Sequence, residues 1–201
     1  PPYHIVTPAM HKSKEDVAKL FANKLGTDPK LTPQELTLVA RNILRKKYIE
    51  AEVGITGANF IIGDIGAIAV TENEGNARLS CAFPKTHIVL VGIEKMIPSI
   101  TDLALFWPLL STFGTGQKLT VYRSIICGPR QAGETDGPEE MFVILLDNNR
   151  TEILKNTAQR ESLYCIRCGA CLNACPVYKN IGGRSYGATY SGPIGSVITP
   201  H

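Results

Sequence analysis

The sequence lacks the features of several specialised protein classes. It has no apolar run of the roughly 18–20 residues that a membrane helix needs, because its longest apolar-rich piece, residues 103–110, contains Pro108. Its formal charge of +3 is small and its basic residues are scattered, so nothing indicates nucleic-acid binding. It has neither a secretory signal nor an initiator methionine, so we expect a processed chain or a fragment. With 201 residues, 44% of them hydrophobic, a globular protein with a substantial core is expected.

Cysteine is scarce outside one short stretch. Four of the six cysteines fall within CIRCGACLNACP, residues 165–176, and only Cys81 and Cys127 lie elsewhere. Such clustering, in a chain large enough to form a core without disulfides, indicates metal ligation in a reducing, cytoplasmic compartment. We expect the two isolated cysteines to be small buried hydrophobic residues rather than ligands.

The spacing of the four clustered cysteines is C-x2-C-x2-C-x3-C-P. It is formed by Cys165, Cys168, Cys171 and Cys175, and it is typical of bacterial ferredoxins, which bind 4Fe-4S clusters through thiolates. Two-residue gaps allow a tightly turned backbone to direct three sulfurs at three corners of one cube. A structural zinc site more often has two separated pairs of ligands, and unliganded thiols or disulfides are the remaining alternatives. The spacing favours an iron–sulfur cluster.

The fourth cysteine of such a run has a separate role. In two-cluster ferredoxins it ligates the other cluster, so Cys165, Cys168 and Cys171 would serve one cluster and Cys175 a second. The sequence contains no second cysteine run. We therefore expect the first half of a two-cluster module, in which this chain alone would have an incomplete or empty site.

The rest of the sequence predicts an α/β protein. Ser13 with Asp16 indicates a helix over residues 13–25, and Thr32 with Glu35 forms a capping box for a helix to about residue 48. Further segments are expected as strands (residues 60–62, 67–70, 86–92, 118–125 and 140–148) and as helices (residues 101–113 and 151–163). Residues 180–201 show no regular pattern. We expect a layered sheet with flanking helices over residues 1–150 and a ferredoxin-like segment over residues 151–201.

A glycine-rich segment, residues 53–76, places polar side chains at the ends of expected strands. Open α/β sheets usually bind ligands there, and Glu74 or Asp64 would be the candidate general base of such a pocket. The simpler interpretation, which we favour, is that the glycines form turns and the Asn and Asp side chains bond local backbone. His87, at the start of a strand, is expected to be a core histidine whose polar atoms are satisfied.

Five segments of the chain resemble the LUD-domain iron–sulfur subunits of bacterial lactate utilisation. They are residues 54–76, 83–98, 127–151, 160–178 and 182–200. The resemblance implies a fold similar to that of CoA transferases and sugar-phosphate isomerases. Because subunits of this type are longer at both ends, it also implies a central fragment. The chain departs from the family at residues 63–66, where Gly-Asp-Ile-Gly replaces the common Ala-Glu-Thr-Gly, and at Cys127, where histidine is expected.

The resemblance also implies a function. Subunits of this kind carry electrons through two 4Fe-4S clusters in a cytoplasmic complex that oxidises L-lactate to pyruvate. The implied partners are a cysteine-rich subunit and a second LUD-domain protein, and the chain alone is not expected to be catalytic. The alternative is a small-molecule-binding protein, or a CoA-transferase- or isomerase-like enzyme, that uses the glycine-rich pocket and carries a structural cluster.

Overall fold

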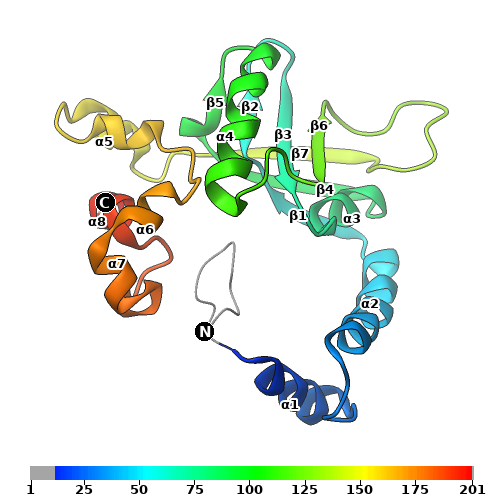
Figure 1. The fold of residues 1–201 in the computed structure, drawn as a ribbon. Coiled ribbons are helices and arrows are strands. Elements are labelled where there is room, and N and C mark those ends of the chain that lie inside the picture. Colours follow the sequence, from blue (N-terminus) through cyan, green and yellow to red (C-terminus); the bar gives the residue numbers. More distant parts are fainter. Residues whose placement is uncertain (1–11, 201) are drawn as a thin grey trace.

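Two helices precede the sheets in the computed structural model, which describes residues 12–200. They are α1 (Lys14–Leu25) and α2 (Pro33–Glu50), which extend away from the strands (Figure 1). Both predicted capping boxes are present, Ser13 with Asp16 and Thr32 with Glu35. The capping boxes in the sequence therefore correctly located the start of both helices.

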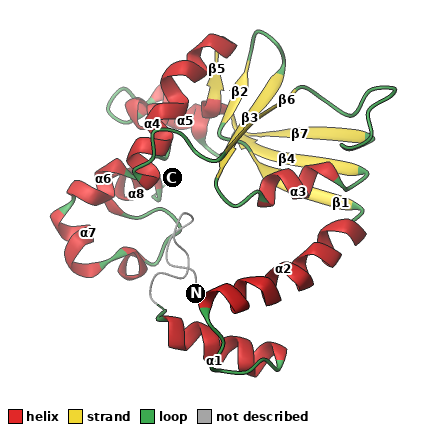
Figure 2. Ribbon diagram, turned by 45° about the vertical axis from the view of Figure 1, so that its right-hand side comes forward, coloured by secondary structure: helices red, strands yellow, loops and turns green. Residues whose placement is uncertain are grey.

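The strands form two sheets, shown in Figure 2. The first has the order β1-β4-β7 and is parallel throughout; its strands are β1 (Val53–Gly57), β4 (Thr86–Gly92) and β7 (Glu140–Leu146). The second has the order β5-β2-β3-β6; its strands are β5 (Met96–Ile97), β2 (Phe60–Ile62), β3 (Ala67–Glu72) and β6 (Tyr122–Ile126). In this sheet β3 is antiparallel to both neighbours, and β5 is parallel to β2.

The second sheet lies between the first sheet and helix α4 (Leu103–Thr115). Alternate residues of its strands point in opposite directions. Ile61 and Ile68 pack with Val89 of the first sheet, whereas Phe60 and Ile62 belong to a separate core with residues of α4. Helix α3 (Asn76–Ala82) lies against β1. The predicted α/β layers are confirmed.

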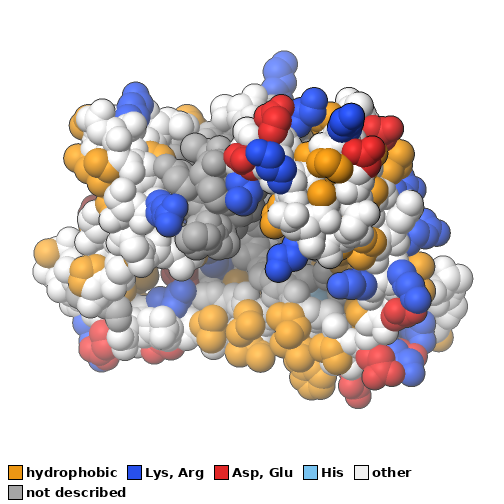
Figure 3. All heavy atoms as spheres, turned by 90° about the horizontal axis from the view of Figure 1, so that it is seen from below, with side chains coloured by type: hydrophobic (Ala, Val, Ile, Leu, Met, Phe, Trp, Pro, Cys, Tyr) orange, Lys and Arg blue, Asp and Glu red, His pale blue; other side chains and the backbone are white. Residues whose placement is uncertain are grey.

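The outer face of the first sheet is apolar and exposed. The register pairs Ile55 of β1 with Ile88 of β4, and Ile88 with Phe142 of β7, so these side chains share a face. Ile55 is 62% exposed and Phe142 is 53% exposed. Seen from below, the molecule has a band of hydrophobic side chains along one edge (Figure 3).

Short helices follow the sheets. They are α5 (Arg150–Lys155), α6 (Ala170–Ala174), α7 (Pro176–Ile181) and α8 (Gly192–Ile198), with 3-10 turns at Arg160–Tyr164 and Gly183–Tyr186. None of the helices within residues 12–200 is long and apolar enough to cross a membrane.

Three expectations for the later elements were wrong. The helix predicted over residues 151–163 is interrupted because the Asn156 side chain accepts a hydrogen bond from the Ala158 N–H (3.0 Å) and so forms a turn. The tail predicted to be irregular contains α8 and a 3-10 turn. The strand expected from residue 118 begins at Tyr122.

Candidate metal centre

A cavity of about 670 Å³ lies within the C-terminal segment. It is bounded by residues 158–172 on one side and residues 189–197 on the other. Cys165, Cys168 and Cys171 line it, together with apolar side chains that include Leu172 and Ile194. The three cysteines that the spacing assigns to one cluster therefore face one space.

The backbone of the cysteine loop changes direction at two residues, Cys165 and Gly169. The Cys165 N–H donates to the Ser162 carbonyl (3.2 Å), which ends the preceding 3-10 turn. Gly169 has φ of 79°, a left-handed conformation that glycine adopts readily, and it begins α6, which carries Cys171. Cys168 also packs against the core beneath α4. The loop is thus attached to the α/β layers and is not a free appendage.

Cys175 lies outside this cavity lining. It is the N-cap of α7, with Pro176 at the first helical position, and its sulfur accepts a hydrogen bond from the Tyr178 N–H (3.4 Å). The structure therefore separates the fourth cysteine of the motif from the first three.

The arrangement of donors fits a cluster better than a single ion. Within residues 12–200, no three His, Cys, Asp or Glu side chains converge closely enough to hold one metal ion. Structural zinc requires ligands that meet at one point, whereas each thiolate of a cubane binds a different iron atom. Three thiols spread around an apolar cavity match the second requirement.

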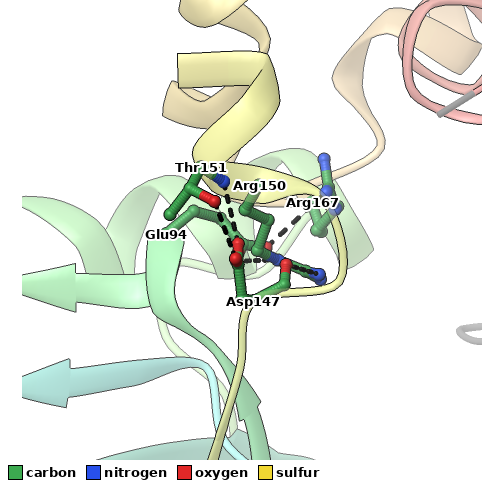
Figure 4. Close-up of polar contacts among 5 residues, drawn as sticks. All are labelled: Glu94, Asp147, Arg150, Thr151 and Arg167. Atoms are coloured by element: carbon green, nitrogen blue, oxygen red, sulfur yellow. Dashed lines mark hydrogen bonds and ion pairs between the residues drawn. The ribbon is translucent and has the colours of Figure 1, made fainter. Parts of the chain in front are cut away.

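A buried ionic network joins the cysteine loop to the sheet layers (Figure 4). The Glu94 side chain is only 4% exposed and forms ion pairs with Arg150 and with Arg167, which is between Cys165 and Cys168 in the motif. The Arg167 Nη2–Glu94 Oε1 distance is 3.7 Å. Burial, together with the nearby Arg167, lowers the pKa of Lys95 to about 8. Removing one partner of such a pair would leave an uncompensated buried charge, which is strongly destabilising.

The local backbone favours this network. Gly92 ends β4, and a β-carbon at this position would overlap the Glu94 carboxylate and lie 2.6 Å from Arg150 Nε. Asp147 accepts hydrogen bonds from the backbone and the hydroxyl of Thr151, which lower the pKa of its carboxyl group and fix the start of α5. The three charged residues of the network come from separate regions of the chain. Glu94 follows β4, Arg150 begins α5, and Arg167 lies in the cysteine loop.

Sequence reasoning did not identify Glu94, Arg150 or the pairing of Arg167. A charged residue between two cysteines could have been noticed at position 167. Nothing in the sequence connects it to Glu94, because the two residues are far apart along the chain and neither belongs to a periodic pattern. Only the tertiary fold brings them together.

Within residues 12–200, the cavity found beside the glycine-rich segment is too small for a ligand. Its polar side chains bond backbone: Asn59 Oδ1 accepts from the Thr71 N–H (2.8 Å), and Asp64 accepts from the Ile100 N–H (3.2 Å). Glu72 accepts from two N–H groups at the start of α3. The adjacent cavity, lined by Thr56 and Glu72 among others, has a volume of about 10 Å³, which is about the size of one water molecule.

His87, Cys81 and Cys127 are the remaining residues that the sequence analysis considered. His87 is fully buried, as expected for a core histidine, and its Nε2 lies 2.7 Å from the Thr56 hydroxyl. Its buried Nδ1 has no hydrogen-bond partner in the described part of the chain, so the expectation that its polar atoms are satisfied was wrong. Cys81 is half-buried on α3, where burial raises the pKa of its thiol. Cys127 is exposed, which contradicts the expectation of a buried residue. It directly follows β6 and begins the irregular connection to β7.

Comparisons with known proteins find two family matches along the chain. Residues 3–146 match the family described as LUD domain, and residues 161–200 match the one described as 4Fe-4S dicluster domain. Proteins named "Lactate utilization protein B" are similar over the whole chain: 48% identical in Bacillus velezensis and 49% in Shouchella clausii. The chain spans 42% of the length of these relatives.

One solved structure is also similar. It is a crystal structure of a DUF162 family protein from Deinococcus radiodurans, 17% identical, with a TM-score of 0.38 over 66% of this chain and 84% of that one. A similarity at this level carries no argument about function.

Proposed function

We propose, from the premise that this chain belongs to the LUD domain family, that it is an iron–sulfur electron-transfer component of lactate utilisation. The match to a 4Fe-4S dicluster domain and the name of the similar proteins support this proposal. A 4Fe-4S cluster supplies one-electron redox chemistry when it is bound. The observation that carries the proposal is the cavity lined by Cys165, Cys168 and Cys171.

The residues have distinct parts in this function. We assign Cys165, Cys168 and Cys171 as ligands of one cluster and Cys175 as a ligand of a second cluster, whose other ligands lie outside this chain. The apolar walls of the cavity would exclude water from the thiolates. The LUD-type domain, residues 1–150, would hold the ferredoxin-like segment, residues 151–201, through the Glu94–Arg167 ion pair and the packing of Cys168.

The biological setting of the proposal rests on the family resemblance of the sequence, and the name of the similar proteins supports only a part in lactate utilization. We place the chain in a cytoplasmic complex that oxidises L-lactate to pyruvate, with a cysteine-rich subunit and a second LUD-domain protein as partners. The small-molecule enzyme hypothesis has less support, because the cavity beside the glycine-rich segment is only about 10 Å³ in volume.

The test is metal content after reconstitution with iron and sulfide in the absence of oxygen. A version extended to the length of the curated relatives should hold two cubane clusters. Cys165→Ser, Cys168→Ser or Cys171→Ser should each cost one cluster, because each removes a ligand that faces the cavity. Cys175→Ser should affect the other cluster. The two losses should be separable by electron paramagnetic resonance.

Cys127→Ser is the matched control, because it removes an exposed thiol outside the motif. It should leave iron and acid-labile sulfide unchanged. Zinc in place of iron, or equal iron content in the unmodified protein and Cys165→Ser, would show that the cavity is not a cluster site.

A further inference from the structure

Unpartnered buried polar atoms are concentrated at the cysteine cavity. Six buried side-chain nitrogen or oxygen atoms within residues 12–200 have no hydrogen-bond partner. Three of them belong to residues that line this one cavity, namely Ser162 Oγ, Arg167 Nη1 and Ser191 Oγ. A buried polar group without a partner is costly, so a site that gathers three of them indicates a missing acceptor.

Ser191 illustrates why these groups are available to a ligand. It occupies the N-cap position of α8, where a serine hydroxyl normally accepts a hydrogen bond from the helix backbone. Here its side chain makes no such bond, although the residue is only 4% exposed. Ser191 is among the residues that line the cavity, and its buried hydroxyl has no hydrogen-bond partner within residues 12–200.

Arg167 is held at the cavity from two sides. Its Nη2 pairs with Glu94, and its guanidinium carbon lies 4.8 Å from the centre of the Tyr190 ring. Its backbone has φ of 64°, an uncommon value for a residue with a side chain, so the surrounding contacts must maintain this conformation. These contacts leave Nη1 as the free donor.

The charges around the cavity favour an anion. Arg150, Arg167 and Lys95 lie around Glu94, and even with the Asp147 carboxylate beside Arg150 these five groups leave an excess of positive charge. A 4Fe-4S cluster with its thiolates is anionic, and its sulfur atoms accept hydrogen bonds. The cavity therefore offers the three thiols, the hydrogen-bond donors and the compensating charge that such a group needs.

We propose that Ser162, Arg167 and Ser191 donate hydrogen bonds to the sulfur atoms of the cluster, and that Glu94 is the positioning residue that holds Arg167 there. This inference rests on the proposed cluster site. The reduced cluster carries one more negative charge than the oxidised cluster, so these donors stabilise it more strongly. Together they raise the reduction potential.

The experiment is a redox titration of the reconstituted, extended protein, with iron content measured in parallel. Arg167→Gln should retain iron and lower one midpoint potential by about 59 mV, which corresponds to a tenfold change in the ratio of oxidised to reduced cluster. Ser162→Ala and Ser191→Ala should shift it in the same direction by less. The potential of the second cluster should stay constant and serve as the internal reference.

Two exposed residues of the same segment provide matched controls. Arg160→Gln removes the same charge and Ser185→Ala the same hydroxyl, and neither residue lines the cavity. Neither control should move the potential. If Arg167→Gln, Ser162→Ala and Ser191→Ala retain iron with the potentials of the controls, the donor proposal is overturned while the cluster site stands.

Glu94→Asp tests the positioning role, because it keeps the charge but shortens the reach to Arg167. It should lower the potential in the unmodified background and have no effect in the Arg167→Gln background. An equal effect in both backgrounds would contradict positioning. If Arg167→Gln fails to take up iron, the potentials of the two serine variants decide the donor proposal. If the unmodified protein takes up no iron, the cluster site itself is refuted.

Discussion

Individual side chains in this protein are used in ways that their residue types do not reveal. Cys175 has the same side chain as Cys171 and lies four positions later, yet its sulfur caps α7 whereas Cys171 lines the cavity. This is the geometry that a ferredoxin run requires if its fourth cysteine is to serve another cluster. Chemical identity and spacing therefore predict the ligand set, but the local turn determines which thiols face the cavity.

His87 leads to a prediction at the scale of one residue. It is fully buried, and burial lowers the pKa of its imidazole, so the folded protein resists protonation of this group. In the unfolded chain a histidine side chain is protonated near pH 6.5. Below this pH the unfolded state therefore binds more protons than the folded state. The free energy of unfolding should therefore fall as the pH decreases through about 6.5 towards the lower folded-state pKa.

Urea unfolding between pH 7.5 and pH 5.5 measures this effect. Carboxyl groups titrate mostly at lower pH and contribute little in this range. His87→Gln should be less stable at neutral pH but should lose the pH dependence. A variant that keeps the full slope would assign the pH dependence to another group.

At the scale of secondary structure, close backbone contacts determine where elements can pack. Gly54 of β1 is buried against α3, and a β-carbon at this position would overlap the carbonyl oxygen of Ser80. Backbone atoms of a packed helix cannot move aside as a flexible side chain can. The sheet and α3 can approach this closely only because residue 54 is glycine.

Gly54→Ala should therefore destabilise the fold by about 1–3 kcal/mol or more, as overpacking typically does. Gly57→Ala is the matched control on the same strand, because its new β-carbon would meet only the Leu90 carbonyl oxygen at 3.7 Å, an ordinary contact. Its effect should stay within about 0.5 kcal/mol. Thermal unfolding of the two variants compares them, and equal melting temperatures would show that α3 shifts at little cost.

The elements were predictable where a local signal specified them. Both capping boxes and the strands at residues 60–62 and 86–92 could be read directly, although the strand at residues 86–92 is buried on one face only and not throughout as expected. Helix α8 could not, because its glycines look like helix breakers. In the structure they permit close packing: a β-carbon on Gly195 would overlap the Tyr190 carbonyl oxygen, and one on Gly192 would overlap Leu172.

The candidate site was predictable only in part for a similar reason. The cysteine spacing identified the three cavity-lining thiols, since local chain geometry relates them. The donors of Ser162 and Ser191 and the carboxylate of Glu94 reach the site through tertiary packing. No local pattern marks a serine that faces a cavity, so these residues became visible only in three dimensions.

In the whole molecule, the outer face of the first sheet is unusually exposed. Parallel sheets normally have both faces covered, but the outer face of the first sheet presents exposed apolar side chains on all three strands. Strand β7 is also at an edge, and Val143, on its other face, is 41% exposed. Apolar surface of this kind favours association.

We predict that the 201-residue chain on its own self-associates through this face. The register partners Leu90 and Ile144 lie side by side on it, so the double variant Leu90→Lys/Ile144→Lys should weaken association at least about tenfold. Light scattering over a range of concentrations measures the molar mass. Leu105→Lys, an exposed leucine on α4, is the control and should not change it.

The Glu94 ion pairs limit how freely the ferredoxin-like segment could be recombined with other proteins. Residues 151–201 include all four cysteines of the motif and Arg167, but the carboxylate that orients Arg167 belongs to another part of the chain, and Arg150 lies just outside that boundary. A gene fusion that transplanted this segment would transfer the ligand spacing and leave the oriented charge behind. The motif is portable between proteins, whereas its electrostatic surroundings must evolve with the host domain.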